Sequence, residues 1–205
     1  MKITRFLAVA LLLTLVAGSL SAYVLLSPRR TWDSAPTLIV DSRGNATIAD
    51  GAGGTTRIRN AIVSTSAWNG AGTGTRINAS VGSVSSFTLG DGRPMLNLRD
   101  PLGACTGGCL AATFTGYYTT RPNGTRRITD ADMVTNPANN LATLGETCSG
   151  SEYYAEGIMV HETGHLLGLG HSSVSGATMF PSVSACNNGP ATIETDDRNG
   201  INDLY

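Results

Sequence analysis

The sequence is poor in charge and has almost no lysine. Charged residues make up only 14% of the 205 residues, and Lys2 is the only lysine. Lysine and arginine together number 14 against 15 aspartate and glutamate residues, with no long basic run. Proteins that bind nucleic acid need a basic patch or stripe. Nucleic-acid binding is therefore not expected.

The N-terminus combines a basic start with a short apolar run. Lys2 and Arg5 precede apolar residues 6–17, and small residues follow at 18–22. This pattern predicts a secretory signal peptide over residues 1–22 with cleavage near 19–22, and hence a secreted, extracellular protein. The alternative is an N-terminal membrane anchor, because apolar residues continue to 26 and give about 20 residues. The glycine and serines inside the run favour cleavage, so no stable membrane association is expected.

The remaining residues are enough for one domain with its own hydrophobic core. About 180 residues follow the predicted leader, which is short for two domains. Without Lys2 and Arg5, 12 basic residues face 15 acidic ones. The chain also contains 25 glycines, which suits an exported, loop-rich fold. We expect a monomer.

Four cysteines in an exported chain predict disulfides, and four cysteines allow three pairings. We favour the pairing of Cys105 with Cys109, which closes a small loop that contains two glycines. Cys148 with Cys186 would then join two distant segments. A metal site made of these cysteines would need reduced thiolates, which export disfavours.

All three histidines of the chain fall in the segment His161-Glu162-Thr163-Gly164-His165-Leu166-Leu167-Gly168-Leu169-Gly170-His171. A helix places His161 and His165 on one face, four residues apart. Gly168 stands where this helix must end, because glycine enters the left-handed region without steric cost. His171 can then return to the same point as a third ligand.

Three neutral imidazoles around zinc leave one tetrahedral position open for water, as in catalytic zinc sites. Glu162 lies next to the first ligand and reaches that water rather than the metal. The sequence therefore predicts one catalytic Zn²⁺ on three histidines, with Glu162 as general base. The alternative is a helix whose histidines bind nothing, but three histidines at ligand spacing rarely arise by chance.

The pattern H-E-x-x-H-x-x-G-x-x-H, followed by a methionine turn, resembles the metzincin clan of zinc endopeptidases. Ser172 after the third histidine resembles the matrixin branch, the family of the matrix metalloproteinases. The segment 177–181 matches the family's turn, with Met179 as its methionine, and residues 196–205 resemble its C-terminal helix.

The resemblance implies an α+β fold with a twisted, mostly parallel sheet of about five strands and two long helices. The catalytic domain would cover residues 30–205, with an upper subdomain at 30–168 and a lower subdomain at 169–205. The lower subdomain would hold the methionine turn and a final helix. Met179 would pack beneath the imidazoles, and one of Asp196 and Asp197 would anchor the turn.

The resemblance also implies hydrolysis of peptide bonds in protein or peptide substrates. Residues 110–115 resemble the edge strand Leu-Ala-His-Ala-Phe, which pairs with extended substrate, so Leu110 and Ala111 are candidate substrate-binding residues. Val183 stands where the family has a tyrosine in the wall of its main specificity pocket. Ala112 replaces a histidine ligand of a second, structural zinc, which we therefore do not expect. The alternative function is a zinc-binding, non-proteolytic relative: a binding module or another amide hydrolase.

Calcium braces loops in matrixin-like chains, and Asp91, Asp130 and Asp132 could bind Ca²⁺. No calcium-loop spacing is present, however, which favours solvated turn residues at these positions.

Pattern and turn composition predict the secondary structure. The strands expected are 37–40, 46–48, 75–79, 95–98, 110–115 and 126–134, and the helices expected are 55–68, the histidine helix up to 167 and a final helix after Thr195. Residues 50–54 are expected to form a flexible break. Ser149 and Glu152 have the spacing of a capping box for the histidine helix.

Overall fold

A computed structural model describes residues 22–45, 47–48, 53–72, 74 and 76–205. The predicted signal peptide lies outside the described residues except for Ala22, and so does most of the predicted break at 50–54. Within the described ranges, no helix has the length and hydrophobicity needed to cross a membrane.

A six-stranded, mostly parallel sheet forms one layer of the molecule. Its strands are β1 (Arg30–Thr31), β2 (Thr37–Asp41), β3 (Asn78–Gly82), β4 (Met95–Asn97), β5 (Ala111–Thr120) and β6 (Arg126–Thr135). The order is β1-β6-β4-β2-β3, with every neighbour parallel, and β5 pairs antiparallel with β6. Because β1 and β4 pair with opposite ends of β6, β5 takes the other side of that strand and ends the sheet. The predicted parallel character is confirmed.

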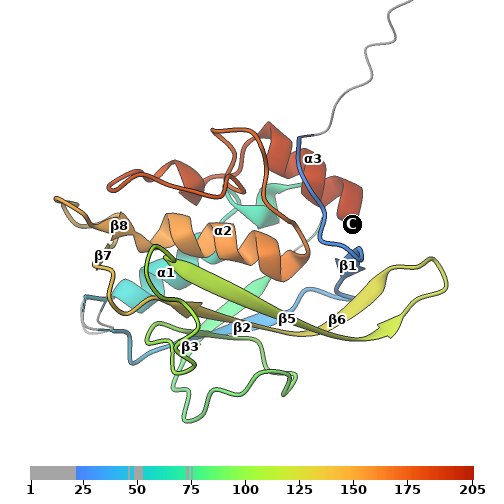
Figure 1. The fold of residues 1–205 in the computed structure, drawn as a ribbon, viewed down its shortest axis with the longest axis horizontal. Coiled ribbons are helices and arrows are strands. Elements are labelled where there is room, and N and C mark those ends of the chain that lie inside the picture. Colours follow the sequence, from blue (N-terminus) through green and yellow to red (C-terminus); the bar gives the residue numbers. More distant parts are fainter. Residues whose placement is uncertain (1–21, 46, 49–52, 73, 75) are drawn as a thin grey trace, which may run out of the picture.

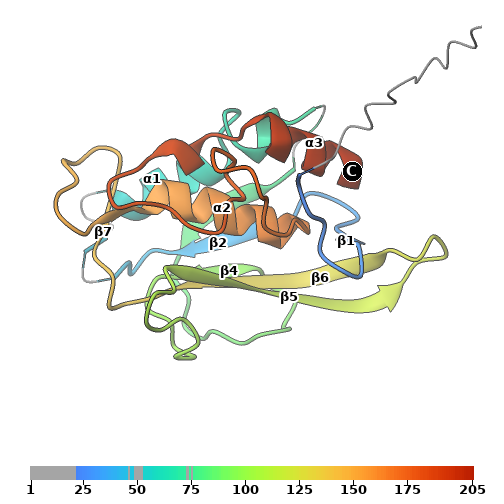
Figure 2. The ribbon, with the colours of Figure 1, turned by 45° about the horizontal axis from the view of Figure 1, so that its top comes forward.

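Helices α1 (Gly54–Ile62) and α2 (Ala155–Leu167) cover the same face of the sheet (Figure 2). Helix α3 (Thr195–Leu204) lies on the far side of α2 from the sheet (Figure 1). Apolar residues pointing from the strands and the two helices meet between the layers, and are fully or almost fully buried: Leu38, Val40, Ile58, Ile62, Leu96, Met133 and Met159. Helix α2 is therefore enclosed, as the apolar residues all round it predict.

The first helix is shorter than predicted. It ends at Ile62, and after Val63 the sequence continues with Ser64-Thr65-Ser66. The Ser64 hydroxyl accepts the backbone N–H of Ser66 at 3.1 Å, and such local bonds compete with helix. Trp68, predicted as the last helical residue, instead begins the 3-10 helix η2 (Trp68–Gly70) and is fully buried.

Several predicted boundaries are also wrong. Thr47 and Ile48 form no strand, because the Asn45 side chain accepts both of their backbone N–H groups at 2.9 and 2.6 Å and closes a turn; Ala46 lies outside the described residues. The strand predicted at 75–79 is β3, three residues later, and Thr75 is not described. The remaining predicted strands coincide with β2, β4, β5 and β6, although β5 runs on to Thr120.

The predicted capping box does not cap α2. The backbone N–H of Ser149 donates to Glu152 Oε2 at 2.8 Å, which closes a turn before the helix. A short strand β8 (Tyr153–Tyr154), paired with β7 (Leu141–Ala142), follows that turn. The helix begins only at Ala155 because this pairing holds the two tyrosines extended. The final helix, predicted after Thr195, begins at Thr195 itself, and Glu194 caps it in a capping box with Asp197.

Residues before the predicted start of the domain at 30 also belong to the fold. The backbone N–H of Leu26 donates to Gly168 O at 3.0 Å, and that of Gly170 donates to Val24 O at 2.7 Å. The segment 22–26 therefore lies along the chain that leaves α2.

Both favoured disulfides are present. Cys105 is joined to Cys109, and Cys148 to Cys186, so the described part of the chain has no free cysteine. The second bond connects the segment before α2 to the segment that follows Met179.

Candidate metal centre

Helix α2 and the turn that follows it bring the three histidines together. His161 and His165 lie one turn apart, and Gly168 ends the helix with a φ of 109°, which only glycine adopts readily. The backbone N–H of Leu169 donates to Gly164 O at 2.9 Å, which reverses the chain toward His171. The ligand atoms of the three side chains all lie within 4.8 Å of one another.

One pair of these nitrogens already has the separation found around a tetrahedral zinc ion. Nε2 of His165 lies 3.2 Å from Nε2 of His171. Zinc–nitrogen bonds of about 2.0–2.1 Å at tetrahedral angles put two ligand nitrogens about 3.3–3.4 Å apart. The two atoms are therefore already at ligand separation.

Backbone carbonyls set the tautomers of the two helix histidines. Nδ1 of His161 lies 2.6 Å from Thr178 O, and Nδ1 of His165 lies 2.8 Å from Leu169 O. A carbonyl only accepts, so each Nδ1 carries the proton and each Nε2 keeps a free lone pair for a metal. Burial lowers the pKa of His161 to about 3 and also lowers the pKa values of His165 and His171, which favours the neutral, ligating form.

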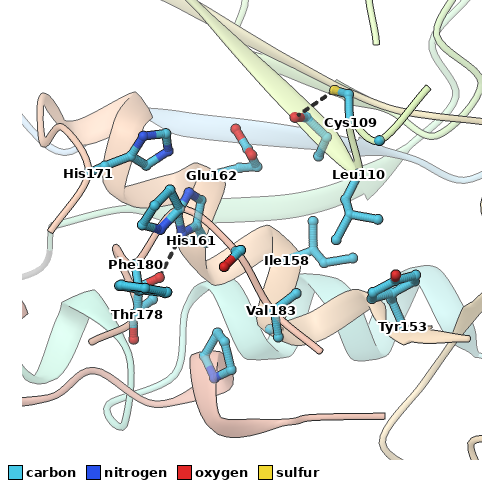
Figure 3. A pocket seen from close by; sticks show the side chains of 16 residues that line it. Cys109, Leu110, Tyr153, Ile158, His161, Glu162, His171, Thr178, Phe180 and Val183 are labelled. Carbon is cyan, nitrogen blue, oxygen red and sulfur yellow. Dashed lines mark hydrogen bonds between the residues drawn. The ribbon is translucent and has the colours of Figure 1, made fainter. Parts of the chain in front are cut away.

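Glu162 is buried beside this cluster, with 6% of its surface exposed. Figure 3 shows it with His161 and His171 on the wall of one cavity. Burial raises the pKa of Glu162 to about 7, and a hydrogen bond from Thr113 partly opposes the rise. A carboxyl group with this pKa is suited to accept and return a proton near neutral pH.

Two cavities meet at the histidines. One of about 280 Å³ is lined by Leu110, Ala111 and Val183, the three predicted substrate-binding residues, and by Tyr153, Gly157 and Ile158 (Figure 3). The other, of about 360 Å³, lies toward Leu26 and Arg30. Ala111, Glu162 and His171 line both cavities. The two cavities together therefore extend on both sides of the candidate metal position.

The predicted supporting residues contact α2, the methionine turn and the segment just after the third histidine. Met179 is 2% exposed and packs against Gly164 of α2. The Asp197 carboxylate accepts the backbone N–H groups of Thr178 and Met179 at 2.7 and 3.0 Å. Asp196 Oδ2 accepts the hydroxyl of Ser172 at 2.6 Å. Asp197 thus ties α3 to the methionine turn itself, and Asp196 ties it to the segment before the turn.

Sequence reasoning missed two side chains that act on this helix. Thr113 donates to the Glu162 carboxylate, and the only sequence signal was its place two residues after Ala111, on the same face of a strand. Trp68 Nε1 donates to Val160 O at 2.7 Å, just before the first ligand. The spacing of Trp68 from the apolar residues before it is compatible with the end of a helix. No local pattern in the sequence indicates its contact with Val160.

The acidic residues proposed for calcium have different environments. Asp91 is exposed, as solvated turn residues are, but Asp130 and Asp132 are each only 1% exposed, so that interpretation is wrong for this pair. Each of the two has a buried carboxylate oxygen without a hydrogen-bond donor. Burial, and secondly Asp130, raises the pKa of Asp132 to about 8.

The fold is α+β, two of the three histidines lie on an enclosed helix, and the third follows the end of that helix. This combination defines the metzincin class. The profile of the matrixin family matches residues 103–205, about half of the chain, and the chain belongs to this family. The match covers the edge strand, α2, the methionine turn and α3.

Individual relatives match shorter stretches. Metalloendoproteinase 5-MMP of Arabidopsis thaliana is 54% identical over 52 residues, which are 24% of this chain and 14% of that protein. Metalloendoproteinase 1 of Glycine max is 46% identical over 55 residues, 27% of this chain and 18% of that protein. Matrilysin of Rattus norvegicus is 36% identical over 63 residues, 26% of this chain and 24% of that protein. The chain thus spans less than a quarter of the length of these relatives.

Proposed function

We propose that this protein is an exported zinc-dependent endopeptidase that hydrolyses peptide bonds. The proposal rests on one observation: the two cavities at the site together extend on both sides of Glu162 and His171. A polypeptide can therefore continue past the site in both directions, as cleavage within a chain requires. The names of the relatives, metalloendoproteinase and matrilysin, support the same activity.

His161, His165 and His171 would hold the zinc through Nε2. When bound, zinc supplies Lewis-acid chemistry that polarises a carbonyl and lowers the pKa of water to about 7. Glu162 accepts the proton of the attacking water as general base and then delivers it to the leaving amine. Thr178 and Leu169 hold the imidazoles in the required tautomer through their carbonyl oxygens. No nucleophilic side chain is needed.

The substrate would bind as an extended peptide along β5. An unpaired sheet edge offers main-chain hydrogen-bonding groups at regular spacing, so it binds peptides without demanding one sequence. Leu110 and Ala111 lie at the start of this edge, and Val183 lines the cavity of about 280 Å³ beside it. This cavity would take one side chain of the substrate. Protein or peptide substrates are the proposed partners.

Met179, Gly168, Asp196 and Asp197 would be supports rather than catalysts. We place the boundary between the upper and lower subdomains at Gly168, where α2 ends and the chain reverses. The protein is proposed to act outside the cell as a monomer.

Calcium is proposed at Asp130 and Asp132. Their two buried oxygens without donors provide the hard, anionic ligands that Ca²⁺ prefers. Addition of calcium should raise the unfolding temperature of the wild type but not of Asp132→Asn. An equal rise in both proteins would place the ion elsewhere.

Incubation of the purified protein with casein tests the proposed function. Cleavage at internal peptide bonds should stop with a zinc chelator and return with added zinc. Glu162→Gln should bind zinc normally but lose at least about 100-fold in kcat, while the exposed control Glu146→Gln retains activity. Zinc binding without cleavage in the wild type would instead favour a non-proteolytic relative.

A further inference from the structure

The hydroxyl of Thr113 touches the proposed general base. Thr113 Oγ1 lies 2.5 Å from Oε2 of Glu162 and 3.2 Å from the backbone oxygen of the same residue. The shorter distance is that of a charge-assisted O–H···O⁻ bond. The family motif Leu-Ala-His-Ala-Phe has alanine at this position, so the matrixin pattern does not require a hydroxyl here.

The contact joins two rigid elements. Thr113 lies opposite Met133 in the paired part of β5 and β6, and Glu162 lies in the middle of α2. Among the described residues, no other side chain donates to the Glu162 carboxylate. Glutamate has three rotatable side-chain bonds, so a lone carboxylate in a hollow would sample several orientations. One bond from the strand therefore decides where the carboxylate points.

The same hydroxyl can serve both charge states of Glu162. When Glu162 is ionised, the Thr113 hydroxyl donates to Oε2. When Glu162 holds the transferred proton on Oε2, it can donate to Thr113 Oγ1, while the threonine proton turns to the backbone oxygen of Glu162 at 3.2 Å. Neither state leaves the hydroxyl or the carboxyl group without a partner, and no heavy atom has to move.

We propose that Thr113 is a positioning residue that holds the Glu162 carboxylate toward the reacting water through its hydroxyl. The inference rests on the proposed endopeptidase function and adds a residue to it. Thr113 lines the cavity of about 360 Å³ beside Glu162, but in this assignment its hydroxyl acts on the reaction only through Glu162.

Three variants test the role. Thr113→Val removes the hydroxyl but keeps the β-branched shape that suits a strand, whereas Thr113→Ser keeps the hydroxyl. Thr119→Val is the matched control, because Thr119 is exposed on the same strand. We expect Thr113→Val to lower kcat about 10- to 100-fold, as the loss of outer-shell partners does, with KM changed by less than about twofold. Thr113→Ser and Thr119→Val should stay within about threefold of the wild type.

A second measurement needs no metal and no turnover. In the zinc-free protein, Thr113→Val should lower the urea midpoint of unfolding clearly more in the wild-type background than in a Glu162→Ala background, because only the former has the contact to lose.

The zinc content of the reconstituted variants should remain one per chain.

The outcomes separate the two proposals. An active wild type with unchanged kcat in Thr113→Val would overturn the role of Thr113 and leave the endopeptidase standing. Equal midpoint shifts in both backgrounds, or failure of Thr113→Ser to restore kcat, would also overturn that role. A wild type that holds zinc but cleaves no peptide would overturn the proposed function and, with it, the catalytic role of Thr113, even if the midpoint shifts show the contact.

Discussion

Met179 packs so tightly against Gly164 that a Cβ atom on this glycine would lie 2.2 Å from the methionine Sδ. The same Cβ would lie 2.7 Å from Cζ2 of Trp68, which is fully buried. Gly164 precedes His165 in α2, so the missing side chain lets Met179 and Trp68 support the helix from behind. The geometry of the metal ligands therefore depends on Gly164, which has no side chain and takes no part in the reaction.

Gly164→Ala should weaken both the fold and the metal site. The new methyl group must displace Met179, and overpacking of this kind costs about 1–3 kcal/mol. Urea unfolding and zinc titration of the variant measure the two effects. Gly176→Ala is the control, because a Cβ there meets nothing within 4 Å. Equal stability and zinc affinity in the two variants would contradict the packing argument.

Asp197→Asn should destabilise the methionine turn. The carboxylate accepts three backbone N–H groups, those of Thr178, Met179 and Glu194, and it is 1% exposed. An asparagine would turn an NH₂ group toward at least one of these donors, so we expect a loss of about 2–3 kcal/mol in the free energy of unfolding. Asp203→Asn on the same helix removes only an exposed ion pair with Arg29 and should cost less than about 1 kcal/mol. Similar losses in both variants would refute the role given to Asp197.

Local signals in the sequence predicted one end of the histidine helix but not the other. Its end at Gly168 follows from the φ that glycine permits, which is a property of that residue alone. Its start does not, because Ser149 and Glu152 satisfy the same spacing rule in a turn as in a cap. The pairing of β8 with β7, a contact with residues 141–142, decided between the two.

Long-range partners also explain what was missed at the site. The ligand set follows from spacing within eleven residues, whereas Thr113 reaches Glu162 from 49 positions away in the chain. The missing calcium-loop spacing favoured solvated turn residues at Asp130 and Asp132, yet both are buried and accept backbone N–H groups from Gly90 and Met95, about 40 positions earlier in the chain. Contacts between such distant segments cannot be inferred from a local pattern.

The two disulfides should contribute unequally to stability. Cys148 and Cys186 are 38 positions apart, whereas Cys105 and Cys109 are 4 apart. Chain entropy predicts that loss of the longer link costs about 2 kcal/mol more than loss of the shorter one. Paired serine substitutions at each disulfide, compared by urea unfolding under oxidising conditions, measure the difference. A larger loss at Cys105–Cys109 would show that strain or local structure outweighs the entropy of the unfolded chain.

Stability should decline with rising pH because of Asp132. Its pKa is raised from 3.8 to about 8 in the folded protein, so the fold retains a proton that the unfolded chain loses. The stabilising contribution is full below about pH 4 and is lost as the pH rises to about 8, at no more than about 1.4 kcal/mol per pH unit. Asp132→Asn should flatten this decline in calcium-free unfolding measurements between pH 5 and 8. An unchanged slope in Asp132→Asn would contradict the assignment.

X-ray absorption at the zinc edge tests the central claim most directly. The zinc-loaded wild type should show one ion per chain, bound by three imidazole nitrogens at about 2.0–2.1 Å with one oxygen ligand. His171→Ala should lose one imidazole from this shell and bind zinc more weakly. A shell that contains sulfur, or that is unchanged in His171→Ala, would contradict the three-histidine centre on which the proposed function rests.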